Sequence, residues 1–98
     1  MFIIREVMQC KPGKVRPLME KFKALSSAVQ ELGRPPLRLL TDVSGDFWTL
    51  VIEVPVEAIE DFFALEQTLM KNEAMGKAMA GYHDLVAHGR REIYRVES

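Results

Sequence analysis

The chain has 98 residues, a formal net charge of −1 and a single cysteine, Cys10. The near-zero charge excludes a basic surface for nucleic acid or an anionic membrane. No apolar run approaches the ~20 residues that cross a bilayer. An unpaired cysteine fits a reducing compartment, and 48 % hydrophobic residues with 28 % charged residues is an ordinary globular composition. We therefore expect a soluble cytoplasmic protein that forms one domain over residues 1–98.

The first predicted element is a strand at Phe2–Cys10, which is apolar on both faces and carries one charge on each, Arg5 and Glu6. The segment Lys14–Leu32 predicts an amphipathic helix, because its apolar residues recur at helical spacing. That stripe consists of Val15, Leu18, Met19, Phe22, Leu25, Val29 and Leu32. Gly33 is placed to terminate the helix.

Two further strands are predicted at Leu37–Val43 and Phe47–Val54, joined by a turn in which Gly45 supplies a positive φ. Alternation along the later strand puts Trp48, Leu50, Ile52 and Val54 on one face, and Phe47 and Val51, with Thr49 and Glu53, on the other. We expect Pro55 to end this strand, because proline lacks the N–H donor that a sheet requires.

A second helical region is predicted to begin at Glu57. Its pattern allows either one long bent helix or two helices with a kink near Asn72. Apolar residues continue at helical spacing to Val86, and Gly89 is expected to end the region. Arg90–Glu97 is then the last predicted strand.

Strand, helix, strand, strand, helix, strand is the ferredoxin-like βαββαβ arrangement, an α+β fold with a four-stranded antiparallel sheet. Right-handed crossovers place both helices on one face of the sheet and make the first and third strands central. Those strands are apolar on both faces, so helices alone leave several large side chains exposed, each worth ~1.5–3 kcal/mol when buried. This predicts a homodimer in which the two sheets face each other.

A strand, then Lys11-Pro12-Gly13-Lys14, then an amphipathic helix resembles the dimeric α/β-barrel superfamily, and the closing strand that begins Gly89-Arg90-Arg91-Glu92 agrees with it. Within that superfamily the chain is similar to the NIPSNAP-like and antibiotic-biosynthesis-monooxygenase-like groups. The resemblance covers essentially the whole chain and implies the sheet-to-sheet dimer. The superfamily includes cofactor-independent oxygenases, haem-degrading enzymes, isomerases and members without known activity, so the fold does not select a function.

Two residues are weak catalytic candidates. His83 offers a general base or a haem ligand, and Arg5 is a charge on a central strand that must be paired or used. For the haem-degrading members the resemblance implies a helix histidine, a first-strand asparagine and a tryptophan. Here no asparagine lies in the first strand and Trp48 is on a strand, which disfavours haem.

An alternative for Arg5 is a structural ion pair with Glu53. Cys10 is expected to be a buried packing residue, and the sequence shows no metal-ligand spacing.

Two functions stay open. In the first, an apolar cleft in each subunit binds a small hydrophobic molecule and oxygenates or rearranges it without a metal. Its lining would be Trp48, Phe62, Phe63, Met79 and Tyr82. In the second, the homodimer is a non-catalytic interaction module. RNA binding ranks below both, because the third strand lacks the aromatic motif of RNA-recognition domains.

Overall fold

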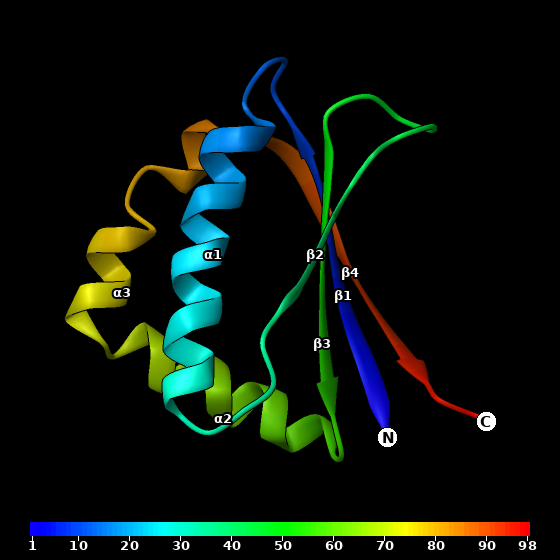
Figure 1. Ribbon diagram of the computed structural model, residues 1–98, viewed down its shortest axis with the longest axis vertical. Coiled ribbons are helices and arrows are strands. Elements are labelled where there is room, and N and C mark those ends of the chain that lie inside the picture. The colour runs from blue at the N-terminus through cyan, green and yellow to red at the C-terminus, as the bar shows by residue number, and fades with distance from the viewer.

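A computed structural model describes residues 1–98. The elements are β1 (Phe2–Cys10), α1 (Val15–Glu31), β2 (Arg38–Thr41), β3 (Thr49–Val56), α2 (Ile59–Met70), α3 (Glu73–Ala78), the 3₁₀ turn η1 (Tyr82–Asp84) and β4 (Val86–Arg95). The strands form one antiparallel sheet in the order β2-β3-β1-β4, and every helix lies on the same side of it (Figure 1). This confirms the predicted ferredoxin-like fold with β1 and β3 at the centre.

The core lies between the sheet and the helices, because that is where both apolar patterns are directed. The sheet contributes alternate residues of β1 and β3, of which Ile4 and Leu50 are fully buried. The stripe of α1 meets them with Leu18, Phe22 and Val29, which confirms the predicted helix. The opposite side of the sheet has no helix, and we call it the open face.

The second helical region divides at Asn72, as the kinked alternative predicted. The Asn72 side chain accepts a hydrogen bond from the Met75 amide at 3.2 Å and so begins α3. The prediction that helical structure continues to Val86 is wrong, because α3 ends at Ala78. Gly81 then adopts a left-handed φ of 82°, which no helix can contain, and only the short η1 turn follows.

The third strand begins and ends two residues later than predicted. Trp48 has a φ of 63°, which breaks the alternation, and the strand begins at Thr49. Asp42 closes the preceding loop by accepting a hydrogen bond from the Thr49 amide at 2.8 Å. Pro55 does not end the strand, because β2 pairs with β3 only as far as Glu53, and beyond that point this side of β3 is a free edge.

The last strand begins earlier than predicted, at Val86, so Gly89 lies within β4 rather than at a helix end. Gly89 pairs with Met8, and a Cβ atom at position 89 would lie 3.2 Å from the Val7 carbonyl oxygen. The close approach of β1 explains the glycine here. A helix terminus and a tight strand contact favour the same residue, so the sequence did not distinguish them.

The open face is more polar than the prediction of two apolar faces required. The apolar residues of β3 that the sequence placed together, Leu50, Ile52 and Val54, all face the helices and are buried. The opposite residues of β3 are Thr49, Val51, Glu53 and Pro55. Phe47 and Trp48 lie outside the strand and are exposed. The open face therefore combines aliphatic side chains with charged ones.

Candidate functional site

A cleft of about 590 Å³ opens between the helix-facing side of the sheet and the three α-helices. Its lining is mostly apolar and comes from α1, α2, α3 and the buried side of β3. The helical contributions include Leu25 and Val29 of α1, Leu65 and Leu69 of α2, and Met75 of α3. Cavities of this volume with apolar walls and few polar groups are typical of small-molecule sites.

The five residues predicted to line a cleft are divided by the structure. Phe62, Met79 and Tyr82 line it. Phe63 points away from it and is 45 % exposed, with its ring edge-on to Phe62 at 5.6 Å between centroids. Trp48 lies outside the cleft as well, because its left-handed backbone places it in the loop before β3.

Three charged side chains form a cluster on the cleft wall, and sequence reasoning missed it as a group. Arg91 of β4 donates from Nε to Glu6 of β1 and from Nη2 to Glu66 of α2, the latter at 2.9 Å. Its guanidinium also lies over the Phe62 ring, 4.8 Å from the centroid. Burial lowers the pKa of Arg91, but the hydrogen bond and charge of Glu6, with those of Glu66, raise it overall. Arg91 therefore stays charged.

A sequence signal for part of this cluster existed. Glu6 and Arg91 each fall on the helix-facing side of a strand, where a charge is costly unless it is paired. Because β1 and β4 are neighbours in a ferredoxin-like sheet, the two residues meet in register. Glu66 gives no comparable signal, since its contact depends on how α2 crosses the sheet.

His83 lies at the margin of the cleft, in η1. Its ring lies on that of Tyr82, with centroids 3.9 Å apart and planes tilted by 34°. The side chain is exposed. His83 is thus the histidine that a molecule in the cleft would approach, whereas His88 lies on the open face.

Lys21 connects α1 to the segment that follows α3 and so supports one wall of the cleft. Its Nζ donates to the Ala80 carbonyl at 2.7 Å and to the Ala78 carbonyl at 3.3 Å. Ala78 is the last residue of α3 and Ala80 lies two residues beyond it, so Lys21 satisfies one carbonyl at the helix end and one in the loop that follows.

Replacing Lys21 by methionine should loosen this segment, because a neutral side chain of similar length cannot donate to either carbonyl. We expect amide hydrogen exchange at residues 78–82 to quicken by about five- to twentyfold, corresponding to about 1–2 kcal/mol for charged hydrogen bonds. Exchange-coupled mass spectrometry measures this. Lys23→Met is the matched control, since Lys23 contacts only Glu20 on its own helix; equal effects of both variants would contradict the anchoring role.

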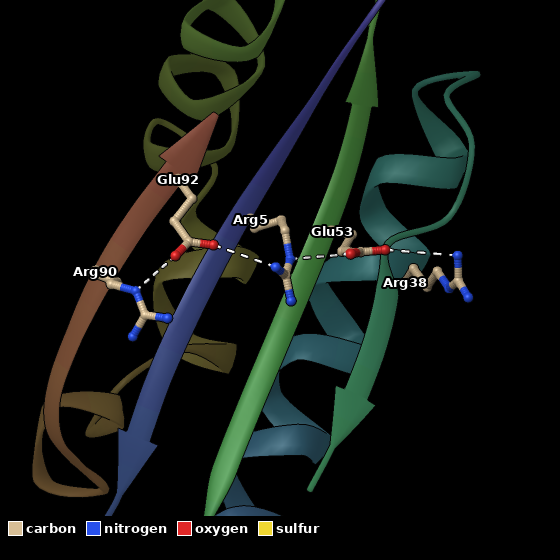
Figure 2. Close-up of polar contacts among 5 residues, drawn as sticks. All are labelled: Arg5, Arg38, Glu53, Arg90 and Glu92. Atoms are coloured by element: carbon tan, nitrogen blue, oxygen red, sulfur yellow. Dashed lines mark hydrogen bonds and ion pairs between the residues drawn. The ribbon is translucent and has the colours of Figure 1, made fainter. Parts of the chain in front are cut away.

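Arg5 lies on the open face, away from the cleft, at the centre of a row of alternating charge (Figure 2). Its Nε is 3.2 Å from Glu53 Oε2 and its Nη1 is 3.4 Å from Glu92 Oε1. Arg38 contacts the far side of Glu53 at 3.7 Å. The structure therefore contains the Arg5–Glu53 pair that was the structural alternative to a catalytic Arg5. We call Arg38, Glu53, Arg5 and Glu92 the charge row.

Arg90 extends this network along β4. It donates from Nε to Glu92 Oε2 at 2.8 Å, and this hydrogen bond is the main reason that the pKa of Glu92 lies below its usual value. One carboxylate of the row is therefore shared between two guanidinium groups. The open face beside it is hollowed by about 520 Å³, between the strands and the loop of residues 42–48.

Cys10 is buried among the core residues, and burial, followed by the nearby Asp42, raises the pKa of its thiol. A protonated, buried thiol is a packing residue rather than a nucleophile.

Nowhere in the chain do three or more histidine, cysteine, aspartate or glutamate side chains lie close enough together to hold a metal ion. None of the helices has the length and apolar character needed to cross a membrane.

The sequence matches no protein-family profile and no curated protein. Solved structures are similar over nearly the full length. An uncharacterized NIPSNAP domain protein from Burkholderia xenovorans superposes with a TM-score of 0.80 at 14 % identity, over 100 % of this chain and 96 % of the other. A NIPSNAP family protein of unknown function from Agrobacterium tumefaciens gives 0.79 at 16 % identity, over 98 % and 87 %.

A protein from Nitrosomonas europaea, provisionally assigned as an antibiotic biosynthesis monooxygenase, gives a TM-score of 0.74 at 16 % identity, with both chains covered completely. The chain has the NIPSNAP-like fold. The antibiotic-biosynthesis-monooxygenase-like structures share it, which confirms the resemblance found in the sequence. At these identities the similarity shows the fold alone, and the activity of this chain must be argued from its own residues.

The cleft does not suit haem. Its polar wall holds two carboxylates and one guanidinium that they already engage, an arrangement that repels the two propionates of a haem. Trp48, the tryptophan considered for such a site, lies elsewhere. We therefore derive no role for haem.

Proposed function

We propose that the protein binds a small hydrophobic molecule in the cleft between its sheet and its helices. The observation that carries this proposal is an apolar cleft of about 590 Å³ with one compact charged cluster on its wall. A folded core of this size normally closes such a space, since unfilled apolar volume is destabilising. A ligand that fills the space would restore the lost contacts.

Oxygenation or rearrangement of such a molecule without a metal is the reaction class that we propose for an enzymatic form of this function. His83 is the group at the cleft margin with the chemistry of a general base. Arg5 has no place in this reaction, because it lies on the opposite side of the sheet and is engaged by Glu53 and Glu92.

Replacing Met79 by tryptophan should fill part of the cleft and weaken binding of an apolar fluorophore, N-phenyl-1-naphthylamine, by at least about tenfold. The added ring occupies volume that the ligand needs. Fluorescence titration measures the dissociation constant. Leu32→Trp is the control, because Leu32 is an exposed residue beyond the end of α1 and lines no part of the cleft. Absence of fluorophore binding by the unmodified protein, or equal binding by both variants, would contradict the proposal.

A homodimer formed through the open face is our second proposal, and the charge row supports it. In strand order the row reads Arg38, Glu53, Arg5, Glu92, so its charges are reversed about the midpoint between β3 and β1 (Figure 2). A two-fold axis parallel to the strands places β3 of one copy opposite β1 of the other, and β2 opposite β4. Glu53 of one copy then faces Arg5 of the other, and Arg38 faces Glu92.

The alternative two-fold axis lies in the interface and runs perpendicular to the strands. It would place each charged residue opposite the same residue of the second copy, so like charges would meet and this arrangement is disfavoured. The aliphatic residues beside the row supply the apolar contact. They are Ile3, Val7, Leu40 and Val51, all of which are half-buried already in a single chain. A non-catalytic role as an interaction module would require this dimer alone, without a ligand in the cleft.

A cytoplasmic location is proposed with both functions. The single cysteine is buried and free, which agrees with a reducing compartment.

A further inference from the structure

The charged cluster of Glu6, Arg91 and Glu66 gives the wall of the cleft a net negative charge. One guanidinium lies between two carboxylates, so the formal charge of the cluster is negative. No other cationic side chain lines the cleft; Tyr82 and His83 are the remaining titratable groups there. A ligand that places a polar head group at this wall would meet net negative charge next to apolar surface, at side chains that stay partly exposed to solvent.

The free hydrogen-bonding groups of the cluster also favour a ligand that donates hydrogen bonds. Arg91 engages one oxygen of each carboxylate, and the second oxygens of Glu6 and Glu66 make no hydrogen bond within the protein. The two free carboxylate oxygens are acceptors. Two of the five N–H groups of Arg91 are used, so two on Nη1 and one on Nη2 remain. One face of the guanidinium is covered by the Phe62 ring, and its charge is already offset by two carboxylates, so these donors make a poor anion site.

We infer that the ligand of this cleft carries a hydrogen-bond donor at its polar end, an ammonium or a hydroxyl group, and no carboxylate. This inference rests on the proposed function, because it concerns the same cleft. The apolar body of the molecule would lie among the side chains of α1, α2 and α3, and its donor would reach the free oxygens of Glu6 and Glu66. Charge-assisted hydrogen bonds of this kind are short and strong.

The test is a series with one alkyl chain and three head groups: octylamine, 1-octanol and octanoate. Each competes against N-phenyl-1-naphthylamine on the full chain at neutral pH and low salt. We expect octylamine to bind most tightly, octanol next, and octanoate at least about tenfold more weakly than octylamine. This ranking uses the unmodified protein and does not depend on any variant being folded.

Glu66→Gln should then reduce the preference for octylamine over octanoate by at least about fivefold, because it removes one negative charge from the cleft and keeps the shape of the side chain. Glu60→Gln is the matched control, since Glu60 lies on the same helix, is exposed and lines no part of the cleft. It should leave the preference unchanged.

The inference would be overturned if octanoate bound as tightly as octylamine, or if Glu66→Gln and Glu60→Gln had the same effect. In both cases the fluorophore would still bind, so the cleft would remain a ligand site. Failure of the fluorophore to bind would instead remove the proposed function itself, and this inference with it.

Discussion

Replacing Val51 by lysine is expected to convert the protein from a dimer into a monomer. Val51 lies on the open face of a central strand, in the aliphatic part that we propose meets a second copy. In a dimer the variant would bury an unpaired ammonium group, which costs about 3–5 kcal/mol. The dimer dissociation constant should therefore rise more than about a hundredfold.

Sedimentation equilibrium or light scattering at micromolar concentration measures the mass directly. The protomer should stay folded, because lysine on the exposed side of a strand keeps its charge in water. Leu32→Lys is the control, since it adds the same charge at an exposed apolar residue on the helical side. A mass equal to one chain for the unmodified protein would contradict the dimer, and an unchanged dimer in Val51→Lys would contradict the open face as its interface.

Leu50, the residue next to Val51, faces the helices, so its replacement should change the stability of the protomer. Leu50→Ala is expected to lower the free energy of unfolding by about 2–5 kcal/mol, because Leu50 is fully buried between the sheet and the helices and its truncation leaves a cavity. For a domain of this size, this loss corresponds to a large fraction of the total stability. Chemical denaturation, monitored by circular dichroism, measures the change.

Leu32→Ala provides the comparison for this second variant, because the same atoms are removed from a residue that is 50 % exposed. We expect a change within about 0.5 kcal/mol there. Comparable losses at positions 50 and 32 would show that the helix-facing core is not where most of the stability arises. Positions 50 and 51 thus test the two faces of one strand separately.

Much of the fold could be predicted from local patterns. The stripe of α1 and the turn with Gly45 each depend on residues close together in the chain, and the structure contains both. The same is true of the break at Asn72, which was one of two alternatives. Element order then led to the sheet order, because connections between strands and helices have a preferred hand. The opening strand, Lys11-Pro12-Gly13-Lys14 and the helix after it led to the NIPSNAP-like resemblance that the solved structures confirm.

The errors occur where one residue type serves two purposes. Pro55 was expected to end a strand, but proline is equally acceptable at an unpaired strand edge, and the short β2 creates one there. Gly89 was expected to end a helix, but glycine also permits the close approach of β1 and β4. Neither the length of β2 nor the position of β4 is a local property.

The candidate site shows the same division. Of the five residues expected to line a cleft, Phe62, Met79 and Tyr82 do so. Trp48 and Phe63 do not, because burial of an aromatic ring depends on backbone conformation and helix orientation. The cluster of Glu6, Arg91 and Glu66 joins three elements. Along the chain, Arg91 is 85 residues from Glu6 and 25 residues from Glu66.

Hydrophobic periodicity, which acts over a few residues, was enough to predict the type and order of the main elements, but not the ends of β3, α3 and β4. Where the core leaves a cleft was decided by the packing of α2 and α3 against the sheet. Which charges meet was decided by the register of the strands and, for Glu66, by the position of α2. Those contacts join residues that are distant in the chain, and their energies depend on distance and burial. A linear pattern contains neither quantity, so beyond the Arg5–Glu53 pair the charge row and the charged wall of the cleft appear only in three dimensions.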